Sequence, residues 1–403
     1  MPNSTPQQVA NRIVEQRMAG RNAPQASKSP EPRSFNPSEL GQNDLLTEVA
    51  GSPYGMLDGR DGELKRALLR DATEESEQAV YAGLKWLAAH QREDGSWHFN
   101  HLNGSCRYCR NPGNHGSTTA ATGLALLPFL GAGHTHLKDG EFKETVRKGL
   151  HFLMGRMLAT PLGGDLQDGS NLYSQGIATL ALCEAYAMTR DRELYSTCAD
   201  AAKFIVSSQH TEGGWRYFPG QVGDTTVTGW MLMGLKSAQL GYVPVPPGVW
   251  TKASKFLDSV QDDDGAAYGY QSPSRDEPTM TAIGLLCRMY GGWPRSRSSL
   301  ARGVRSLGKR GPSQSDMYFD YYATQVMHHY GGNEWQAWNV VMREQLVKTQ
   351  DRRGHESGSW YFPDKHGDQG GRLYNTAMAI MILEVYYRYM PIYGDRALID
   401  TPK

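Results

Sequence analysis

The stretch Gln209-His210-Thr211-Glu212-Gly213-Gly214-Trp215-Arg216-Tyr217 decides the fold of this 403-residue chain. It follows an amphipathic segment, 194–209, and precedes a much more apolar one, 225–240, both with helical periodicity. Glycine supplies the tight or left-handed backbone with which helices end. The stretch therefore predicts a turn between two helices. We expect its tryptophan to pack back on these helices and its leading glutamine to tie the turn by hydrogen bonds.

The same turn recurs along the chain. Related stretches occupy 94–97, 264–270 and 358–362, and Gln91, Gln261 and Gln350 precede them. Equivalent positions of the preceding helices are 66, 52, 52 and 50 residues apart, at Trp86, Phe152, Phe204, Phe256 and Ser306. A period near 50 residues indicates repeated units that bury their apolar faces only by stacking on one another.

Six such units are recognisable, and each contains two helices. The first helices are amphipathic and are predicted at 75–91, 144–158, 194–209, 249–261, 297–309 and 335–350. The second helices are apolar on all sides and are predicted at 116–130, 172–189, 225–240, 278–290, 316–330 and 372–390. Amphipathic helices outside buried ones predict an all-α protein, an (α/α)6 toroid over residues 73–396. An open solenoid is the alternative, but the first and last units lack the polar character of capping repeats.

Residues 1–72 differ in composition from the repeats. Pro24, Pro30, Pro32 and Pro37 lie among Ser, Asn and Gln, with few large apolar residues. Such a segment buries too little apolar surface to offset the entropy of ordering it. We expect a disordered or loosely docked arm, with a plain linker as the alternative.

Bulk properties exclude several classes of protein. Lys+Arg and Asp+Glu both number 42, so there is no excess positive charge of the kind that attracts nucleic acid. No apolar run is long enough to span a membrane, and the first residues lack the apolar core of a secretory signal. The five unevenly spaced cysteines do not form a disulfide framework. The expected location is the cytoplasm, with a soluble part of a larger anchored protein as the alternative.

The Gln…Gly-x-Trp turns between paired helices resemble the repeats of squalene–hopene and oxidosqualene cyclases and of protein prenyltransferase β-subunits. This resemblance extends over residues 75–393. The stretches 171–178, 223–230, 281–290 and 370–376 also resemble prenyltransferase/squalene-oxidase-repeat proteins of planctomycete bacteria. The resemblance implies a central cavity that holds an apolar, isoprenoid small molecule. It leaves open whether the protein is an enzyme, and if so a terpene cyclase or a prenyltransferase-like one.

Cyclases of the resembling class protonate their substrate with an Asp-x-Asp-Asp-Thr motif. The nearest match is the stretch 221–226, where only Asp224 and Thr225 correspond, and Gln221 and Gly223 replace the first two motif carboxylates. This departure weakens the case for proton-initiated cyclisation, and an N-cap is the alternative role of Asp224. The candidate catalytic residues are Asp224 as the acid, supported by Asp316, Asp320 and Arg372.

Two further groups have alternative interpretations. The aromatic residues Tyr173, Trp230, Tyr322 and Tyr374 lie on the inner segments and are candidate ligand-binding residues, with core packing as the alternative. The run Asp262-Asp263-Asp264 has the composition of a diphosphate–magnesium box, but three adjacent carboxylates in a turn are usually solvated.

The stretch 98–115 concentrates metal-type ligands, with three histidines and a Cys-x-x-Cys pair. Thiolate and imidazole around a tetrahedral ion is zinc chemistry. The predicted ligand set is Cys106, Cys109, His115 and His98, as a structural zinc site. A protein without metal and a catalytic zinc are the alternatives.

Two other classes of function compete with isoprenoid binding. One is a non-catalytic toroid that binds a protein or a glycan. The other is an (α/α)6 polysaccharide lyase or hydrolase, which would need paired carboxylates in an open groove. A closed apolar cavity would favour the isoprenoid hypothesis, and an open charged groove the lyase or hydrolase.

Overall fold

The computed structural model describes residues 60, 71–103, 106–364, 366–389 and 392–393. Every described residue belongs to one of the two units into which the chain divides, residues 44–403. Apart from Arg60, Asp71 and Ala72, the arm expected over residues 1–72 lies outside the described residues.

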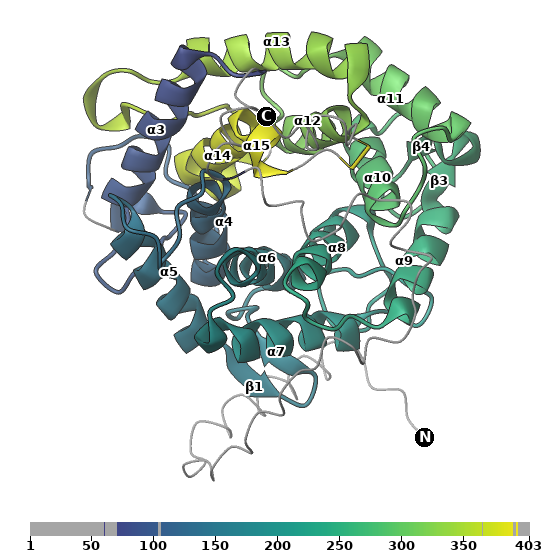
Figure 1. Ribbon diagram of the computed structural model, residues 1–403, viewed down its shortest axis with the longest axis horizontal. Coiled ribbons are helices and arrows are strands. Elements are labelled where there is room, and N and C mark those ends of the chain that lie inside the picture. The colour runs from purple at the N-terminus through teal and green to yellow at the C-terminus, as the bar shows by residue number, and fades with distance from the viewer. Residues whose placement is uncertain (1–59, 61–70, 104–105, 365, 390–391, 394–403) are drawn as a thin grey trace, which may run out of the picture. The chain divides into compact units, whose positions relative to one another are not determined.

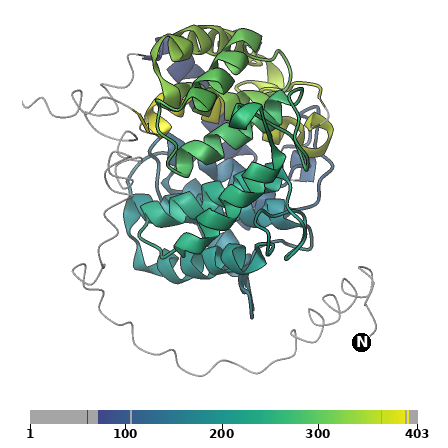
Figure 2. The ribbon, with the colours of Figure 1, turned by 90° about the vertical axis from the view of Figure 1, so that its right-hand side faces the viewer.

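The described part of this unit is a double ring of six helix pairs, shown from two directions in Figures 1 and 2. The all-α (α/α)6 toroid is thereby confirmed. The outer helices are α3 (Glu74–Ala89), α5 (Lys143–Arg156), α7 (Arg192–Ser208), α9 (Pro247–Val260), α11 (Ser298–Arg310) and α13 (Gly332–Thr349). The inner helices are α4 (Thr118–Gly131), α6 (Leu172–Thr189), α8 (Thr225–Leu240), α10 (Pro278–Tyr290), α12 (Met317–Tyr330) and α14 (Gly367–Leu383).

Burial follows the two kinds of sequence pattern. Outer helix α9 buries only a stripe, which consists of Val249, Ala253, Phe256, Leu257 and Val260. Inner helix α8 buries every residue except Lys236 and Gln239. This difference is expected, because an amphipathic helix exposes one face to solvent, whereas an apolar helix is enclosed by its neighbours. Among the described residues, no helix has both the length and the apolar character needed to cross a bilayer.

Each tryptophan turn is fixed to both helices of its pair. The backbone N–H of Trp215 donates to Thr228 Oγ1 at 3.0 Å, and its indole N–H donates to the carbonyl of Ile205 at 2.8 Å. Trp97 and Trp360 repeat both bonds with the equivalent residues of their own helices. The predicted packing of the aromatic residue against the helices is therefore present in three of the turns.

The glutamines join neighbouring units. The side-chain amide of Gln209 donates to the carbonyl of Val249, on the next outer helix, at 3.0 Å, and Gln91 donates likewise to Thr145. In the sixth unit, Gln350 donates to the carbonyl of Ala79 on α3 at 2.8 Å. The last unit thus bonds to the first as the first and third units bond to their successors, and this contact closes the ring.

The structure adds three features to the predicted pattern. Two hairpins, β1 (Leu158–Thr160) with β2 (Gly163–Asp165) and β3 (Gln261–Asp262) with β4 (Ala267–Tyr268), occupy turns after α5 and α9. The helix predicted at 372–390 is interrupted: α14 ends at Leu383 and the short α15 (Val385–Arg388) follows. At the start of α14, Gly371 has a φ of 60°, so the regular part of the helix begins at the next residue.

Replacing Gly213 by alanine is expected to lower stability clearly more than replacing Gly220. Both glycines have positive φ, 93° and 69°, which costs an alanine roughly 1 kcal/mol. A Cβ at Gly213 would also lie 1.9 Å from the carbonyl oxygen of Lys252, whereas Gly220 has nothing within 4 Å. Urea unfolding of the two variants measures the difference, and equal losses would contradict the predicted contact between turn and helix.

Candidate functional site

Asp224 is the residue around which polar groups gather at the start of the inner helices. Its Oδ1 accepts hydrogen bonds from the backbone N–H of Val227 at 2.8 Å and from Thr226 Oγ1 at 2.7 Å. Asp224 therefore caps α8, as its alternative interpretation expects. Its Oδ2 accepts a hydrogen bond from the Tyr270 hydroxyl at 3.1 Å and lies 3.8 Å from Arg216 Nε.

These bonds continue into a network that we call the tyrosine relay, made of Tyr173, Tyr217, Asp224, Thr226 and Tyr270. The hydroxyls of Tyr217 and Tyr270 are 3.0 Å apart, and the hydroxyl of Tyr173 lies 2.5 Å from Thr226 Oγ1. Asp224 itself has an exposed fraction of 0%, while the three tyrosines are only partly buried. The tyrosines, and not the carboxyl group, are the members of the relay that a ligand can touch.

Burial sets the charge state of the relay. It raises the pKa of the Asp224 carboxyl, against the opposing effect of its three hydrogen-bond donors and Arg216. Burial also raises the pKa of the Tyr173 and Tyr270 phenols, so both are neutral at physiological pH. Arg216 is the cation beside the relay, and its guanidinium lies 5.2 Å from the centre of the Tyr217 ring.

Three of the four predicted ligand-binding residues, Trp230, Tyr322 and Tyr374, belong to a continuous aromatic group. The indole N–H of Trp230 donates to the Tyr318 hydroxyl at 2.9 Å, and the Trp230 ring lies 6.0 Å from that of Tyr322. The His366 ring lies 5.0 Å from Tyr318 and 6.4 Å from Tyr374, and so connects the two. The hydroxyls of Tyr322 and Tyr374 are buried without a hydrogen-bond partner among the described residues.

The other carboxylates proposed from sequence lie at the start of α12 and make their own bonds. Asp316 caps α12 by accepting from the backbone N–H of Phe319 at 2.9 Å. Asp320 Oδ1 accepts from the backbone N–H of Ser313 at 2.8 Å, while Oδ2 has no partner among the described residues. Burial raises the pKa of Asp320 well above its ordinary value, which favours a neutral carboxylic acid. Neither residue bonds to the tyrosine relay within the described structure.

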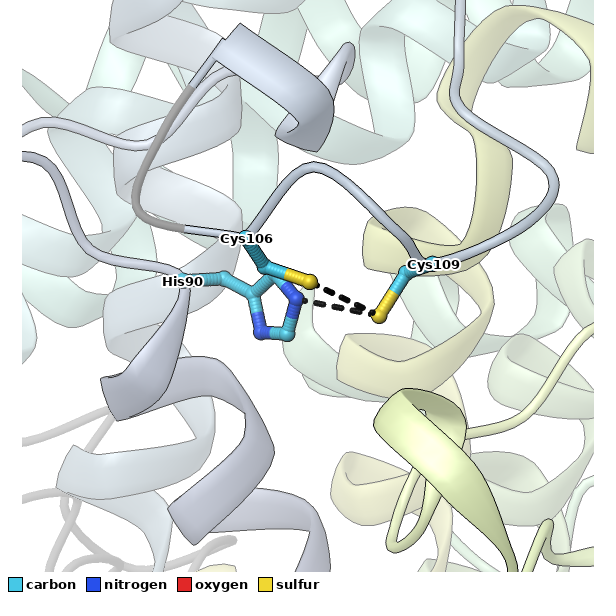
Figure 3. A group of neighbouring side chains, drawn as sticks. All are labelled: His90, Cys106 and Cys109. Atoms are coloured by element: carbon cyan, nitrogen blue, oxygen red, sulfur yellow. Dashed lines mark hydrogen bonds between the residues drawn. The ribbon is translucent and has the colours of Figure 1, made fainter.

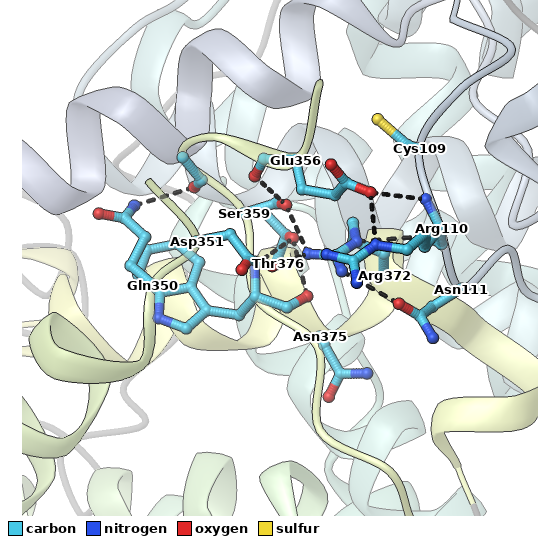
Figure 4. Close-up of polar contacts among 12 residues, drawn as sticks. Cys109, Arg110, Asn111, Gln350, Asp351, Glu356, Ser359, Arg372, Asn375 and Thr376 are labelled. Atoms are coloured by element: carbon cyan, nitrogen blue, oxygen red, sulfur yellow. Dashed lines mark hydrogen bonds and ion pairs between the residues drawn. The ribbon is translucent and has the colours of Figure 1, made fainter. Parts of the chain in front are cut away.

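Arg372 serves a different region, shown in Figure 4. Its guanidinium donates to Asp351 Oδ2 at 2.5 Å, to Ser359 Oγ at 3.0 Å and to Asn111 Oδ1 at 3.0 Å. These partners belong to the first and sixth turns, so Arg372 joins the two ends of the ring and is not brought to Asp224. The aspartate run 262–264 lies in the β3–β4 hairpin, where Arg275 and Arg302 pair with it.

Figure 3 shows the cysteine pair with a histidine that the sequence prediction did not include. His90 Nε2 lies 3.3 Å from Cys109 Sγ, and the two sulfurs are 3.4 Å apart. Together these residues could hold a metal ion. The predicted ligands His98 and His115 make other contacts: each accepts a backbone N–H, from Asn100 and Ser117 respectively.

The predicted ligand set does not include His90, because this residue lies at the C-cap of α3 and precedes the ligand-rich stretch 98–115.

Fold and site define a class: an (α/α)6 toroid whose inner helices carry a group of aromatic side chains. No family model matches the chain, and no curated protein matches it in sequence. The type II terpene cyclase MstE from Scytonema, in complex with geranylgeranyl dihydroxybenzoate, is similar in structure, with a TM-score of 0.52 at 14% identity. That match covers 78% of this chain and 97% of the cyclase.

Glycan-active proteins share the same architecture. An inactive variant of an alpha-1,6-mannanase of Salegentibacter, in complex with alpha-1,6-mannotetrose, has a TM-score of 0.54 at 9% identity and covers 78% of this chain and 99% of its own. An alpha-amylase from Clostridium perfringens has a TM-score of 0.51 at 11% identity, with coverage of 77% and 97%. At such identities the likeness shows the fold, and the chemistry depends on the residues of this chain.

Proposed function

We propose that this protein binds an apolar, isoprenoid-type ligand against the rings of Tyr173, Tyr217 and Tyr270, the partly buried tyrosines of the relay. The observation that carries the proposal is that the relay hydroxyls bond to one another and to Asp224. The groups that remain for a ligand are therefore ring faces. Aromatic ring faces pack well against hydrocarbon chains, because such chains form no hydrogen bonds.

A carbohydrate is the second candidate ligand because of the shared architecture, but the relay fits it less well. Sugar recognition needs free hydrogen-bonding groups, and glycoside hydrolysis needs two carboxyl groups on either side of the bond that breaks. Asp224 is fully buried and bonded through both oxygens, and the adjacent aspartates at 262–264 belong to an outer hairpin. We therefore assign Asp224 a positioning role, in which it holds the phenol of Tyr270 and the start of α8.

The proposal predicts a ring-dependent affinity for isoprenoids. Geranylgeraniol, squalene and geranylgeranyl diphosphate are titrated into the full-length protein and followed by tryptophan fluorescence. Replacing Tyr173 by alanine is expected to weaken binding of the ligand by about tenfold or more, since a buried aromatic ring contributes about 1.5–3 kcal/mol. Tyr195→Ala, on the outer helix α7 with 43% of its side chain exposed, is the matched control and should bind as the parent does.

Mannotetraose in the same titration separates the two candidate ligands. Binding of mannotetraose without any isoprenoid would overturn the proposal in favour of a glycan-binding toroid, and binding of neither would favour a scaffold that binds proteins. Mass spectrometry of the isoprenoid mixtures tests for turnover. A cyclised product that Asp224→Asn abolishes would make the protein a cyclase and Asp224 more than a positioning residue.

A further inference from the structure

Four potential metal ligands meet where the first and sixth turns lie together. His90 Nε2, Cys106 Sγ and Cys109 Sγ all lie within 4.8 Å of one another, and Cys106 Sγ lies 3.7 Å from Nδ1 of His355. His90 ends α3, the cysteines follow in the first turn, and His355 belongs to the short helix η7 (Gly354–Glu356) of the sixth turn. The group therefore combines residues separated by up to 265 positions in the sequence, from 90 to 355.

Three of the six distances among these four ligand atoms are close to the edges of a zinc tetrahedron. Zinc–sulfur bonds of about 2.3 Å and zinc–nitrogen bonds of about 2.0–2.1 Å place two sulfurs roughly 3.8 Å apart and a sulfur and a nitrogen roughly 3.5 Å apart. The observed values are 3.4 Å between the sulfurs, 3.3 Å from Cys109 Sγ to His90 Nε2 and 3.7 Å from Cys106 Sγ to His355 Nδ1. A disulfide would need an S–S distance of about 2.05 Å, and both cysteines are free.

Neighbouring groups hold the imidazole of His90 in a fixed orientation, as hydrogen-bond partners of ligand histidines do in zinc proteins. His90 Nδ1 lies 2.6 Å from the carbonyl oxygen of Trp86, so this nitrogen carries the proton and Nε2 directs its lone pair toward Cys109. The His90 ring also stacks on the Trp86 indole at 3.9 Å. The indole N–H of Trp86 in turn donates to the carbonyl of His355 at 3.1 Å, which places η7 beside α3.

We propose that His90, Cys106, Cys109 and His355 form a structural Zn²⁺ site that fastens the first turn of the ring to the sixth. Two thiolates and two imidazoles are a complete tetrahedral ligand set, which leaves no position for a substrate. Other polar contacts also join the first turn to the sixth. Arg110 donates to Glu356 through its backbone N–H, at 3.0 Å, and through its Nε, at 2.9 Å. The site is independent of the ligand proposed for the inner face.

The first test is the zinc content of the full-length protein, purified under reducing conditions and reconstituted with Zn²⁺. About one bound zinc per chain is expected, as measured by inductively coupled plasma mass spectrometry. Cobalt in place of zinc should give thiolate charge-transfer bands and the visible bands of a tetrahedral ion. A zinc-free protein without these cobalt bands would overturn the proposal.

Variants then identify the ligands. His355 is exposed, so His355→Ala leaves the core intact and is expected to weaken zinc binding by about 100-fold or more. Cys106→Ser should do the same. His98→Ala is the matched control, because the imidazole of His98 accepts a local backbone N–H and its loss should leave the zinc content unchanged.

Two outcomes contradict the assignment. Loss of zinc from His98→Ala together with retention in His355→Ala would support a site confined to the first turn. His101, whose ring lies 5.5 Å from that of His90, also belongs to the first turn. Loss of zinc from His101→Ala, with retention in His355→Ala, would therefore also support a site confined to the first turn. Removing zinc by a chelator should also lower the midpoint of thermal unfolding in the parent protein and leave that of Cys106→Ser unchanged.

Discussion

Replacing Glu184 by alanine is expected to destabilise the ring by about 3–5 kcal/mol, the usual cost of removing one partner from a buried ion pair. Glu184 lies on α6 with no exposed surface. Both of its oxygens lie 3.1 Å from Arg388 Nη2, and Arg60 Nη1 lies 2.9 Å from Oε2. The Tyr389 hydroxyl donates to the same carboxylate at 2.7 Å. The alanine variant would leave two guanidinium groups buried without this counter-charge.

The free energy of unfolding of the variant is measured in urea. Glu344→Ala is the matched control, because it removes a carboxylate that pairs with Lys348 on the exposed surface of α13, and its stability should equal that of the parent. A Glu184→Ala variant as stable as the parent would mean that the two arginines find other partners when the carboxylate is absent.

The same carboxylate predicts a pH dependence. Burial opposes the ionisation of Glu184, but Arg388 and Arg60 outweigh it and hold the pKa below its ordinary value. A lowered folded-state pKa contributes stability that is fully present above the unfolded pKa of about 4.3 and is lost as the pH falls through the folded value. The stability difference between the parent and Glu184→Ala should therefore be constant near neutral pH and shrink below about pH 4.

Replacing Trp215 by alanine is expected to cost a similar amount, about 3–5 kcal/mol. Trp215 is fully buried between α7 and α8, and its indole N–H satisfies the carbonyl of Ile205. Alanine leaves a large void and an unpaired carbonyl at the end of α7. Because neighbouring units bury each other's faces, a defect in one turn weakens its contacts with two units.

Two further substitutions test this explanation. Trp215→Phe keeps most of the buried volume and loses the indole bond, so it should cost roughly 1–3 kcal/mol. Phe218→Ala, three residues further along with 57% of its side chain exposed, should change the unfolding free energy little. A Trp215→Ala loss no larger than that of Phe218→Ala would show that the tryptophan turn does not fasten the two helices.

Much of the fold was predictable because its signals are local and repeated. The bounds predicted for α6, α8 and α10 agree with the structure. The signals that define a helix, namely its apolar periodicity, its caps and its glycine turns, all lie within about 20 residues of sequence. The interruption before α15 was not predicted, because the residues on both sides of Glu384 continue the helical pattern.

The sites were less predictable because they join residues distant in the chain. The cysteine pair was evident from its spacing, but His355 lies 249 residues after Cys106. Glu184 and Arg388 are 204 residues apart, and no feature near either residue signals their pairing. The partners of Arg372 were not predictable for the same reason: the residue lies at the start of an inner helix, whereas its partners lie in the first and sixth turns.

The closing bond from Gln350 to Ala79 has a consequence for biosynthesis, because 271 residues separate the two partners. At about 5–20 residues per second, a ribosome needs roughly 15–50 s to pass from one to the other. During that interval the nascent chain is an open arc whose two ends expose apolar helices to water. Such species aggregate readily, so chaperone capture during translation should raise the yield of this protein, and truncation before the sixth unit should abolish its solubility.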